Sequence, residues 1–510
     1  MSLKQHFRIM LAWLASSWLL AFATSSQAAE MALADQPLFL GTQIDPNVFF
    51  MMDDSGSMDW EILTKDYHYY TDYWAPTGSP VGVQADGPFV GFSSVGECSG
   101  RETYLYIYDS DAASNNDNVY DSCSYPTLED HPEAYVRDWR AYSSSVNVMH
   151  YNPAITYSPW IGFPNASFTA ARSNPQVGSS GYTKLRNLTG FVYEVWEDDH
   201  GANLNGNGEI DSGIADANDT PNDVVDLWDS HTKYTVNGAQ LDTVQHDIPV
   251  AATMQALGNT CDLTAAQANP PYGTCFGTST TAGSISGAST DPFGRTLAQV
   301  KQNVANWYQY HRRRSFVSKG AVDLVVNGNP NFRFGYSQIN DYSSVFVEVP
   351  SAVEDDYTVH NAALLQEMYD YAWSSNGTPL RRGLERVGRY YDGDYGYTDP
   401  IISACQQNYA ILFTDGEWNG SSPVLAGIGD EDGDGDSDNL SDVAHYFYNK
   451  DLSPLDNDVP TTPIDPNTEQ HMVSFTVAFG LTGNLVDTDD DGYPNPELEE
   501  DGAWHDGNVT

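Results

Sequence analysis

Basic residues are scarce in this chain: 22 lysines and arginines stand against 70 aspartates and glutamates, for a formal net charge of −48 over 510 residues. This balance argues against nucleic acid as a partner, because binding it requires lysines and arginines that neutralise phosphates. Two explanations of the acidity remain open, a solvated surface suited to a saline habitat and a set of aspartate-rich calcium loops, and we expect both to contribute.

Apolar runs long enough to cross a bilayer are also lacking. The longest apolar run, residues 9–23, is shorter than the roughly 20 residues of a spanning helix. Lys4 and Arg8 precede it, and Ser26–Ala28 follows it. This order predicts a secretory signal over residues 1–28, with an uncleaved anchor as the alternative. We therefore expect an exported protein that does not span the membrane after cleavage and lies at the cell surface, in the periplasm or at the outer membrane.

Cysteine is rare, with five in the whole chain. Cysteines of exported proteins commonly form disulfides. Proximity in sequence favours the pairs Cys98–Cys123 and Cys261–Cys275, each worth about 2–4 kcal/mol if formed. Cys405 is left over, either as a buried thiol or with a partner outside this chain.

Apolar and amphipathic segments alternate over the parts of the chain that flank its centre. Buried strands are expected at residues 47–52, 409–414 and 473–479, and further strands at 332–339 and 344–349. Helical periodicity with one apolar face covers residues 297–325, 362–373, 379–391 and 441–452. Strands buried on both faces that alternate with helices indicate a doubly wound α/β domain.

Residues 59–295 interrupt this domain between its first strand and its first helix. They are rich in Tyr, Trp, Gly, Asn, Ser and Pro, with many turn signals. We expect a large, irregular, disulfide-stapled insertion. Long connections are usually functional and aromatic rings are enriched in binding surfaces, so we assign it to partner recognition. The alternative for most of its rings is that they form its own core.

A possible metal site follows the first strand. Asp53, Ser55 and Ser57 form D-x-S-x-S at its carboxyl end, where open α/β sheets place their ligand sites. Thr378, before a helix, offers another hydroxyl, and Asp415, after the second buried strand, another carboxylate. Hard oxygen ligands of low total charge suit Mg²⁺ or Mn²⁺ and leave a coordination position open. The alternative is a capped turn, since Asp and Ser favour turns.

Three loops carry carboxylates or amides at alternate positions, the spacing that calcium loops use. They comprise Asp430, Asp432, Asp434, Asp436 and Asp438, then Asp487, Asp489 and Asp491, and a less charged set of Asn203, Asn205, Asn207 and Asp211. None has the bidentate Glu at position twelve of a full EF-hand. We expect Ca²⁺ at these loops, with a solvated acidic loop as the alternative.

The segments at residues 53–58, 378–382 and 414–416 (DDSGSM, TPLRR and TDG) together resemble the metal-ion-dependent adhesion site of von Willebrand factor A domains. In that family a carboxylate from the partner completes the metal's shell. The resemblance implies a von Willebrand A-like fold and assigns the metal to the five Asp, Ser and Thr residues named above.

A narrower resemblance rests on residues 151–160, 303–314 and 331–336, which are similar to the N-terminal half of the PilC/PilY family of type IV pilus tip adhesins and assembly factors. It implies minor pilins at the pilus tip and a host or abiotic surface receptor as partners. That family continues into a β-propeller, which is absent here, and the last helix of the A domain is missing too. We therefore expect a fragment or a truncated product.

These inferences divide the chain into a signal (1–28), the first strand and metal motif (29–58), the insertion (59–295), the remainder of the A domain (296–485) and an Asp-rich, calcium-like tail (486–510), apparently truncated. The expected function is metal-dependent adhesion or pilus assembly, without catalysis. A calcium-stabilised structural surface protein with a vestigial adhesion site is the alternative. A metal-dependent hydrolase is disfavoured, because the histidines form no motif and hydroxyl and carboxylate ligands make a weaker Lewis acid than a zinc site.

Overall fold

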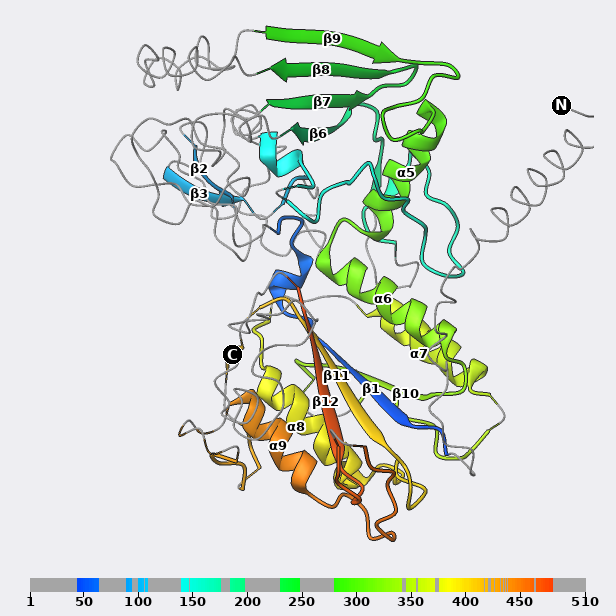
Figure 1. Cartoon of the computed structure of the whole chain (residues 1–510), viewed down its shortest axis with the longest axis vertical. Helices are drawn as coiled ribbons and strands as arrows, with labels where there is room; N and C mark the ends of the chain where they lie inside the picture. The colour runs from blue at the N-terminus through cyan, green and yellow to red at the C-terminus, as the bar shows by residue number, and fades with distance from the viewer. Residues whose placement is uncertain are drawn as a thin grey trace, which may run out of the picture. The chain divides into compact units, whose positions relative to one another are not determined.

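The computed structural model describes residues 44–63, 89–93, 100–108 without 105, 139–175 without 146, 184–197, 230–247, 279–341, 345–371 without 355, 376–416, and most of 418–479. Figure 1 draws them in colour. The signal segment and the tail lie outside the described residues. So do Cys98, Cys123, Cys261 and Cys275, and the loop residues Asn203, Asn205, Asn207, Asp211, Asp432, Asp434, Asp436, Asp438, Asp487, Asp489 and Asp491. The disulfide and calcium assignments therefore stay predictions.

Four parallel strands form the sheet that carries the expected site. They are β1 (Asn47–Met52), β10 (Arg333–Gln338), β11 (Asn408–Thr414) and β12 (Met472–Ala478), in the order β10-β1-β11-β12. Every residue of β1 is buried, as its unbroken apolar sequence predicts for an inner parallel strand. Because all four run the same way, their carboxyl ends lie at one edge of the sheet.

Alternate side chains of β1 point to opposite faces of the sheet, and helices cover both faces. Phe50 belongs to a core shared with α5 (Leu297–Tyr310), α6 (Arg314–Gly328) and α7 (Thr358–Asp370). It stacks on Phe334 of β10 with ring centroids 5.4 Å apart. This face buries large apolar groups, each worth about 1.5–3 kcal/mol.

The opposite face is covered by α8 (Leu380–Tyr391) and α9 (Leu440–Asn449), as Figure 1 shows. Phe49 contacts Tyr390 there at 5.4 Å between centroids. Gly388 of α8 lets Phe447 of α9 approach, since a Cβ at Gly388 would lie 2.3 Å from that ring. Helices on both faces of a parallel sheet confirm the predicted mixed α/β architecture.

Three expectations about these elements need correction. The apolar periodicity over 297–325 belongs to two helices, α5 and α6, which residues 311–313 separate. The strand expected at 344–349 does not form within the described residues there, where Val347 makes only an isolated bridge to Tyr336. The outer part of β12 is open, with Phe475 52% exposed, because β12 pairs with β11 alone in the described sheet.

The described part of the insertion is more regular than expected. Its largest element is a four-stranded antiparallel sheet, visible as green arrows in Figure 1, of β6 (Phe191–Glu197), β7 (Ser230–Val236), β8 (Leu241–Asp247) and β9 (Ser279–Ile285). Two smaller antiparallel pairs are β2 (Phe89–Ser93) with β3 (Gly100–Tyr104) and β4 (Ala171–Arg172) with β5 (Leu185–Arg186). The short 3-10 turn η2 (Trp139–Tyr142) also belongs to the insertion, and two others, η1 (Gly56–Asp59) and η5 (Asp394–Gly396), follow β1 and α8.

Many rings of the insertion are interior residues. Tyr151 and Tyr193 are fully buried, with centroids 5.0 Å apart, and Trp307 of α5 packs against Tyr151. Tyr151 and Tyr193 thus lie in a core, as the alternative interpretation predicts, but the insertion shares that core with α5 and the parallel sheet. In the part of the chain that the structure describes, no helix combines the length and the apolar character needed to cross a bilayer.

Polar side chains of α5 hold the segment around residues 157–172. Asn303, Asn306 and Gln309 recur every three residues, so they lie along one side of the helix. Their side-chain oxygens accept hydrogen bonds from the backbone N–H groups of residues 157, 166 and 172 at 2.7, 3.0 and 3.0 Å. A segment without regular structure thereby has its buried backbone groups satisfied, which ties α5 to the insertion.

Candidate metal centre

Asp53 is the first residue beyond β1, and its carboxylate is fixed from two strands. Its Oδ1 accepts a hydrogen bond from the Ser55 N–H at 2.7 Å, and its Oδ2 accepts one from the Thr414 hydroxyl at 2.7 Å. The Asp53 N–H in turn donates to the Phe413 carbonyl, continuing the β1–β11 ladder by one residue. Asp53 is completely buried as a result.

The two serines and Asp415 continue from Asp53 as a chain of oxygen atoms. The Oγ atoms of Ser55 and Ser57 lie 3.0 Å apart, and the Ser57 hydroxyl donates to Asp415 Oδ1 at 2.8 Å. The short turn η1, which contains Ser57, bends the chain back toward the end of β11, where Asp415 follows Thr414. The structure thus brings together four of the five residues predicted from the sequence.

Thr378, the fifth residue, lies on the loop before α8 and is 5% exposed. Its N–H donates to Asn419 Oδ1 at 2.8 Å, and its hydroxyl accepts from Asn419 Nδ2 at 3.4 Å. The same loop is joined to the turn that carries the two serines (residues 55–57, the serine turn), because Gly56 N–H donates to the Asn376 carbonyl at 3.1 Å. Gly377 lets the Asn419 side chain approach the Thr378 backbone, since a Cβ at Gly377 would lie 2.4 Å from Asn419 Oδ1.

The electrostatics of this cluster favour a cation. Burial and, after it, the nearby Asp415 carboxylate raise the pKa of the Asp53 carboxyl to about 7, against the lowering effect of the bonds from Ser55 and Thr414. Two buried carboxylates beside two hydroxyls are a donor set of hard oxygens, the kind that Mg²⁺ and Mn²⁺ take. The residues present therefore fit the predicted metal.

Asp54 points away from this cluster. Its carboxylate accepts hydrogen bonds from the Asn340 backbone N–H at 3.1 Å, from Asn340 Nδ2 at 2.9 Å and from the Tyr371 hydroxyl at 2.5 Å. Burial raises its pKa as well. Asp54 joins the segments that follow β10 and α7 to the loop that carries Asp53 and Ser55. The sequence analysis did not assign this supporting role.

Arg314 is a functional candidate that the sequence analysis missed. Its Nη1 donates to Asp415 Oδ2 at 2.6 Å and its Nη2 to the Ile62 carbonyl at 2.9 Å, and the side chain is fully buried. The guanidinium carbon also lies 5.0 Å from the centroid of the Trp60 ring. The available signal was the run of three arginines at 312–314 in a chain so poor in basic residues.

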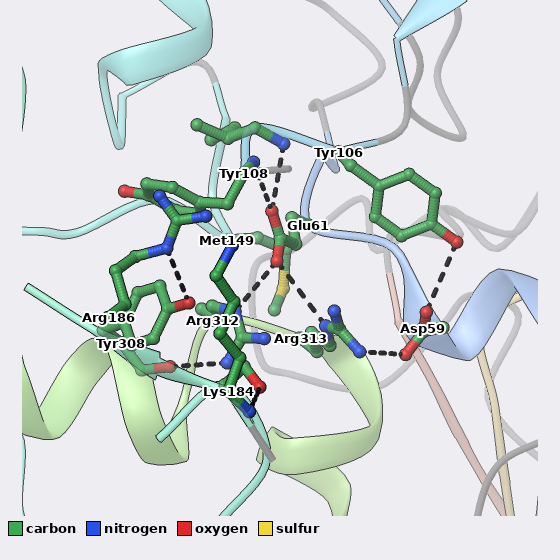
Figure 2. Close-up of polar contacts among 12 residues, drawn as sticks. Asp59, Glu61, Tyr106, Tyr108, Met149, Lys184, Arg186, Tyr308, Arg312 and Arg313 are labelled. Carbon is green, nitrogen blue, oxygen red and sulfur yellow. Dashed lines mark hydrogen bonds and ion pairs between the residues drawn. The ribbon is translucent and has the colours of Figure 1, made fainter. Parts of the chain in front are cut away.

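The two preceding arginines pair with acidic residues of the segment that follows the serine turn. Figure 2 shows Arg312 donating to Glu61 and Arg313 donating to Asp59, at 2.9 and 2.6 Å. Glu61 also accepts hydrogen bonds from the backbone N–H groups of residues 107 and 108, at 3.0 and 3.1 Å. The start of α6 is therefore tied by buried ion pairs to the start of the insertion.

One residue of the acidic loops is described with its contacts. Asp430 Oδ1 accepts a hydrogen bond from the Gly435 N–H at 3.3 Å. Gly433 and Gly435 have φ values of 81° and 94°, the left-handed region that glycine enters without strain. The loop leads into α9, which begins with a capping box between Asn439 and Asp442. The bend that the glycines predict is present, and calcium at this loop stays a prediction.

The remaining cysteine, Cys405, is half-buried and forms no disulfide within the described residues. Its Sγ lies 3.4 Å from the Ser403 hydroxyl. Neither alternative given for Cys405 is decided by these contacts.

These observations define a class: a parallel α/β domain whose carboxyl edge carries two buried aspartates, two serines and a threonine on three loops. Among curated proteins, the chain is 29% identical over 240 residues to the type IV pilus biogenesis factor PilY1 of Pseudomonas aeruginosa strain PAK. This match covers 37% of this chain and 20% of that relative. PilY1 of strain PAO1 is 28% identical over 241 residues, with the same coverage, and PilY1 of strain UCBPP-PA14 is 27% identical over 231 residues, with 36% and 19% covered.

No protein-family model and no solved structure matches the chain. The matched region spans about a fifth of the length of the PilY1 proteins. The chain is thus related to the PilC/PilY proteins, as the motifs at residues 151–160, 303–314 and 331–336 predicted.

Proposed function

We propose that this chain is a cell-surface adhesin or assembly factor of type IV pili that binds its partner through a metal held in a von Willebrand A-like domain. The proposed ligands are Asp53, Ser55, Ser57, Thr378 and Asp415, and the metal is Mg²⁺ or Mn²⁺. The observation that carries the proposal is the continuous oxygen cluster from Asp53 through the two serines to Asp415, which joins residues of two strand ends. The relationship to PilY1, a type IV pilus biogenesis factor, supports the assignment to the pilus.

The residues of the cluster have separable roles. Asp53, gripped by Ser55 N–H and the Thr414 hydroxyl, presents a fixed carboxylate. The serine hydroxyls are neutral ligands that neutralise none of the metal's charge. The bound metal supplies a positive centre with an open position, and an anionic group such as a partner carboxylate suits that position. The partners that this role requires are minor pilins at the pilus tip and a host or abiotic surface receptor.

A second candidate function is a calcium-stabilised structural surface protein whose adhesion site no longer binds a metal. The Arg314 ion pair favours it, because a guanidinium already neutralises one carboxylate of the cluster. The two candidates differ in one measurable property. The adhesin binds Mg²⁺ at the cluster, whereas the structural protein takes up calcium at its acidic loops alone.

The test compares Asp53→Asn with Asp54→Asn in the full chain. Both residues are fully buried and adjacent, but Asp54 bonds to Asn340 and Tyr371, away from the cluster. Asp53→Asn is expected to weaken Mg²⁺ binding, measured by calorimetry, by more than about 100-fold, beyond the 10–100-fold typical of residues that only support a ligand. It should also abolish pilus-dependent attachment at normal surface levels, while Asp54→Asn, which supports the loop without belonging to the cluster, should lose no more than about 10–100-fold in Mg²⁺ affinity and keep measurable attachment. Unchanged Mg²⁺ binding in Asp53→Asn excludes the proposed adhesion site.

A further inference from the structure

Arg314 is held more tightly than an arginine that merely balances a surface charge. It is the first residue of α6 and is fully buried. One guanidinium nitrogen donates to Asp415 Oδ2 and another to the Ile62 carbonyl. Trp60 covers the guanidinium, with its ring centroid 5.0 Å from Cζ. Such a guanidinium stays charged and cannot swing away without leaving Asp415 unpaired in the interior.

This placement changes both the geometry and the charge of the cluster. Arg314 donates to Asp415 Oδ2 and Ser57 donates to Oδ1, so each oxygen of the carboxylate has its own donor and the orientation of the group is fixed. When Asp53 and Asp415 are ionised they carry two negative charges together, and Arg314 reduces this sum to one. A divalent metal then leaves the cluster with an excess of one positive charge, where two unopposed aspartates would leave none.

We propose that Arg314 is a positioning residue that turns Asp415 toward Ser57 and keeps the metal electron-poor. The site then binds the metal less tightly and binds an anionic partner group more tightly. This inference rests on the proposed metal-dependent function. It predicts opposite effects of one substitution: loss of the Arg314 charge strengthens metal binding and weakens capture of a carboxylate. A purely structural arginine predicts loss of both or of neither.

The neighbouring arginines separate this role from anchoring. Arg312 and Arg313 are similarly buried and directly precede the same helix, but their partners Glu61 and Asp59 lie outside the oxygen cluster. Anchoring of α6 to the insertion therefore has two ion pairs of its own, beside the single hydrogen bond from Arg314 to the Ile62 carbonyl. Arg312→Gln is the matched control, since it removes a buried charge from the same turn without touching Asp415.

The experiment uses the full chain with Arg314→Gln, Arg314→Lys and Arg312→Gln, each checked for folding by circular dichroism. Mg²⁺ affinity is measured by calorimetry. Carboxylate capture is measured by adding acetate to the Mn²⁺-loaded protein and following water-proton relaxation, which falls when acetate displaces water from the metal. Arg314→Gln is expected to bind Mg²⁺ about tenfold more tightly and acetate about tenfold more weakly, as removal of a fixed positive charge next to a ligand requires. Arg314→Lys keeps the charge and should stay near wild type in both, as should Arg312→Gln.

A double-substitution cycle covers the case in which Arg314→Gln fails to fold. Asp415→Asn alone removes one negative charge and one ligand carboxylate and should weaken Mg²⁺ binding, and Arg314→Gln with Asp415→Asn restores the net charge and should recover the part of the affinity that depends on charge. Equal Mg²⁺ affinity in the single and double variants overturns the role of Arg314 while the metal site stands. A wild-type chain that binds no Mg²⁺ overturns both proposals. If Arg314→Gln then gains Mg²⁺ binding, the guanidinium of Arg314 takes the place of the metal as the positive charge beside Asp415.

Discussion

The Ser57 hydroxyl lies 2.8 Å from Asp415 Oδ1, although 358 residues separate the two in the sequence. The chain leaves the sheet after the serine turn, passes through the whole insertion and returns before it forms β11. Asp415 directly follows β11, and Ser57 lies in the turn after the neighbouring parallel strand β1, so the carboxyl edge of the sheet brings them together.

The first prediction concerns pH. The pKa of the Asp53 carboxyl, about 7 when folded, lies above its value near 4 in an unfolded chain. The folded state therefore holds this proton more tightly, and the stability it contributes is present below pH 4 and lost as pH rises to 7. With a metal chelator present, the free energy of unfolding should fall between pH 4 and pH 7 by up to about 4 kcal/mol more in wild type than in Asp53→Asn. Denaturant titrations at several pH values measure it, and parallel curves for the two proteins contradict it.

The second prediction concerns the ion pairs of Figure 2. Glu61→Gln leaves Arg312 without its buried partner and weakens the bonds to two backbone N–H groups. The free energy of unfolding should fall by about 3–5 kcal/mol, the usual cost of breaking a buried pair. Arg389→Gln breaks the more exposed pair with Asp394 and should cost less than about 1 kcal/mol. Similar losses in the two variants would show that burial does not set the strength of these pairs.

The third prediction concerns the amides of α5. Asn306→Ala removes the acceptor of the Ala166 N–H and the donor to the Tyr157 carbonyl, both of which become unsatisfied. The expected loss is about 2–3 kcal/mol in thermal or denaturant unfolding. Asn327→Ala, on the exposed side of α6, is the control and should change stability by less than about 0.5 kcal/mol. An equal effect of both substitutions would contradict the bracing role of Asn306.

The fourth prediction concerns the acidic loops. Calcium that binds only the folded state raises the melting temperature by mass action. Joint replacement of Asp432 and Asp434 by Asn should remove part of that gain, whereas Asp456→Asn, at an exposed aspartate outside the loops, should keep it. Scanning calorimetry with calcium and with chelator measures the difference. If chelator leaves the wild-type melting curve unchanged, the loops are solvated surface.

Much of the sheet and of the oxygen cluster follows from local sequence. An unbroken apolar run such as residues 47–52 has to be buried on both faces, and the polar turn that follows it lies at the ligand-binding edge of a parallel sheet. The strand expected at 344–349 does not form within the described residues, because a strand also needs a pairing neighbour that local sequence does not supply. Its alternating pattern was compatible with a strand, but pairing depends on a neighbour, and Val347 bridges to Tyr336 alone.

The sequence by itself determined the parallel α/β class, the position of Asp53, Ser55 and Ser57 after β1, and the relationship to pilus proteins, because these depend on patterns within short segments. Only the tertiary structure decided the pairing of Arg314 with Asp415, across 101 residues, and the rise in the Asp53 pKa. Burial and the distance between charges are set by contacts between segments far apart in the chain, and no local pattern encodes which of the three arginines meets Asp415 and which two meet Asp59 and Glu61.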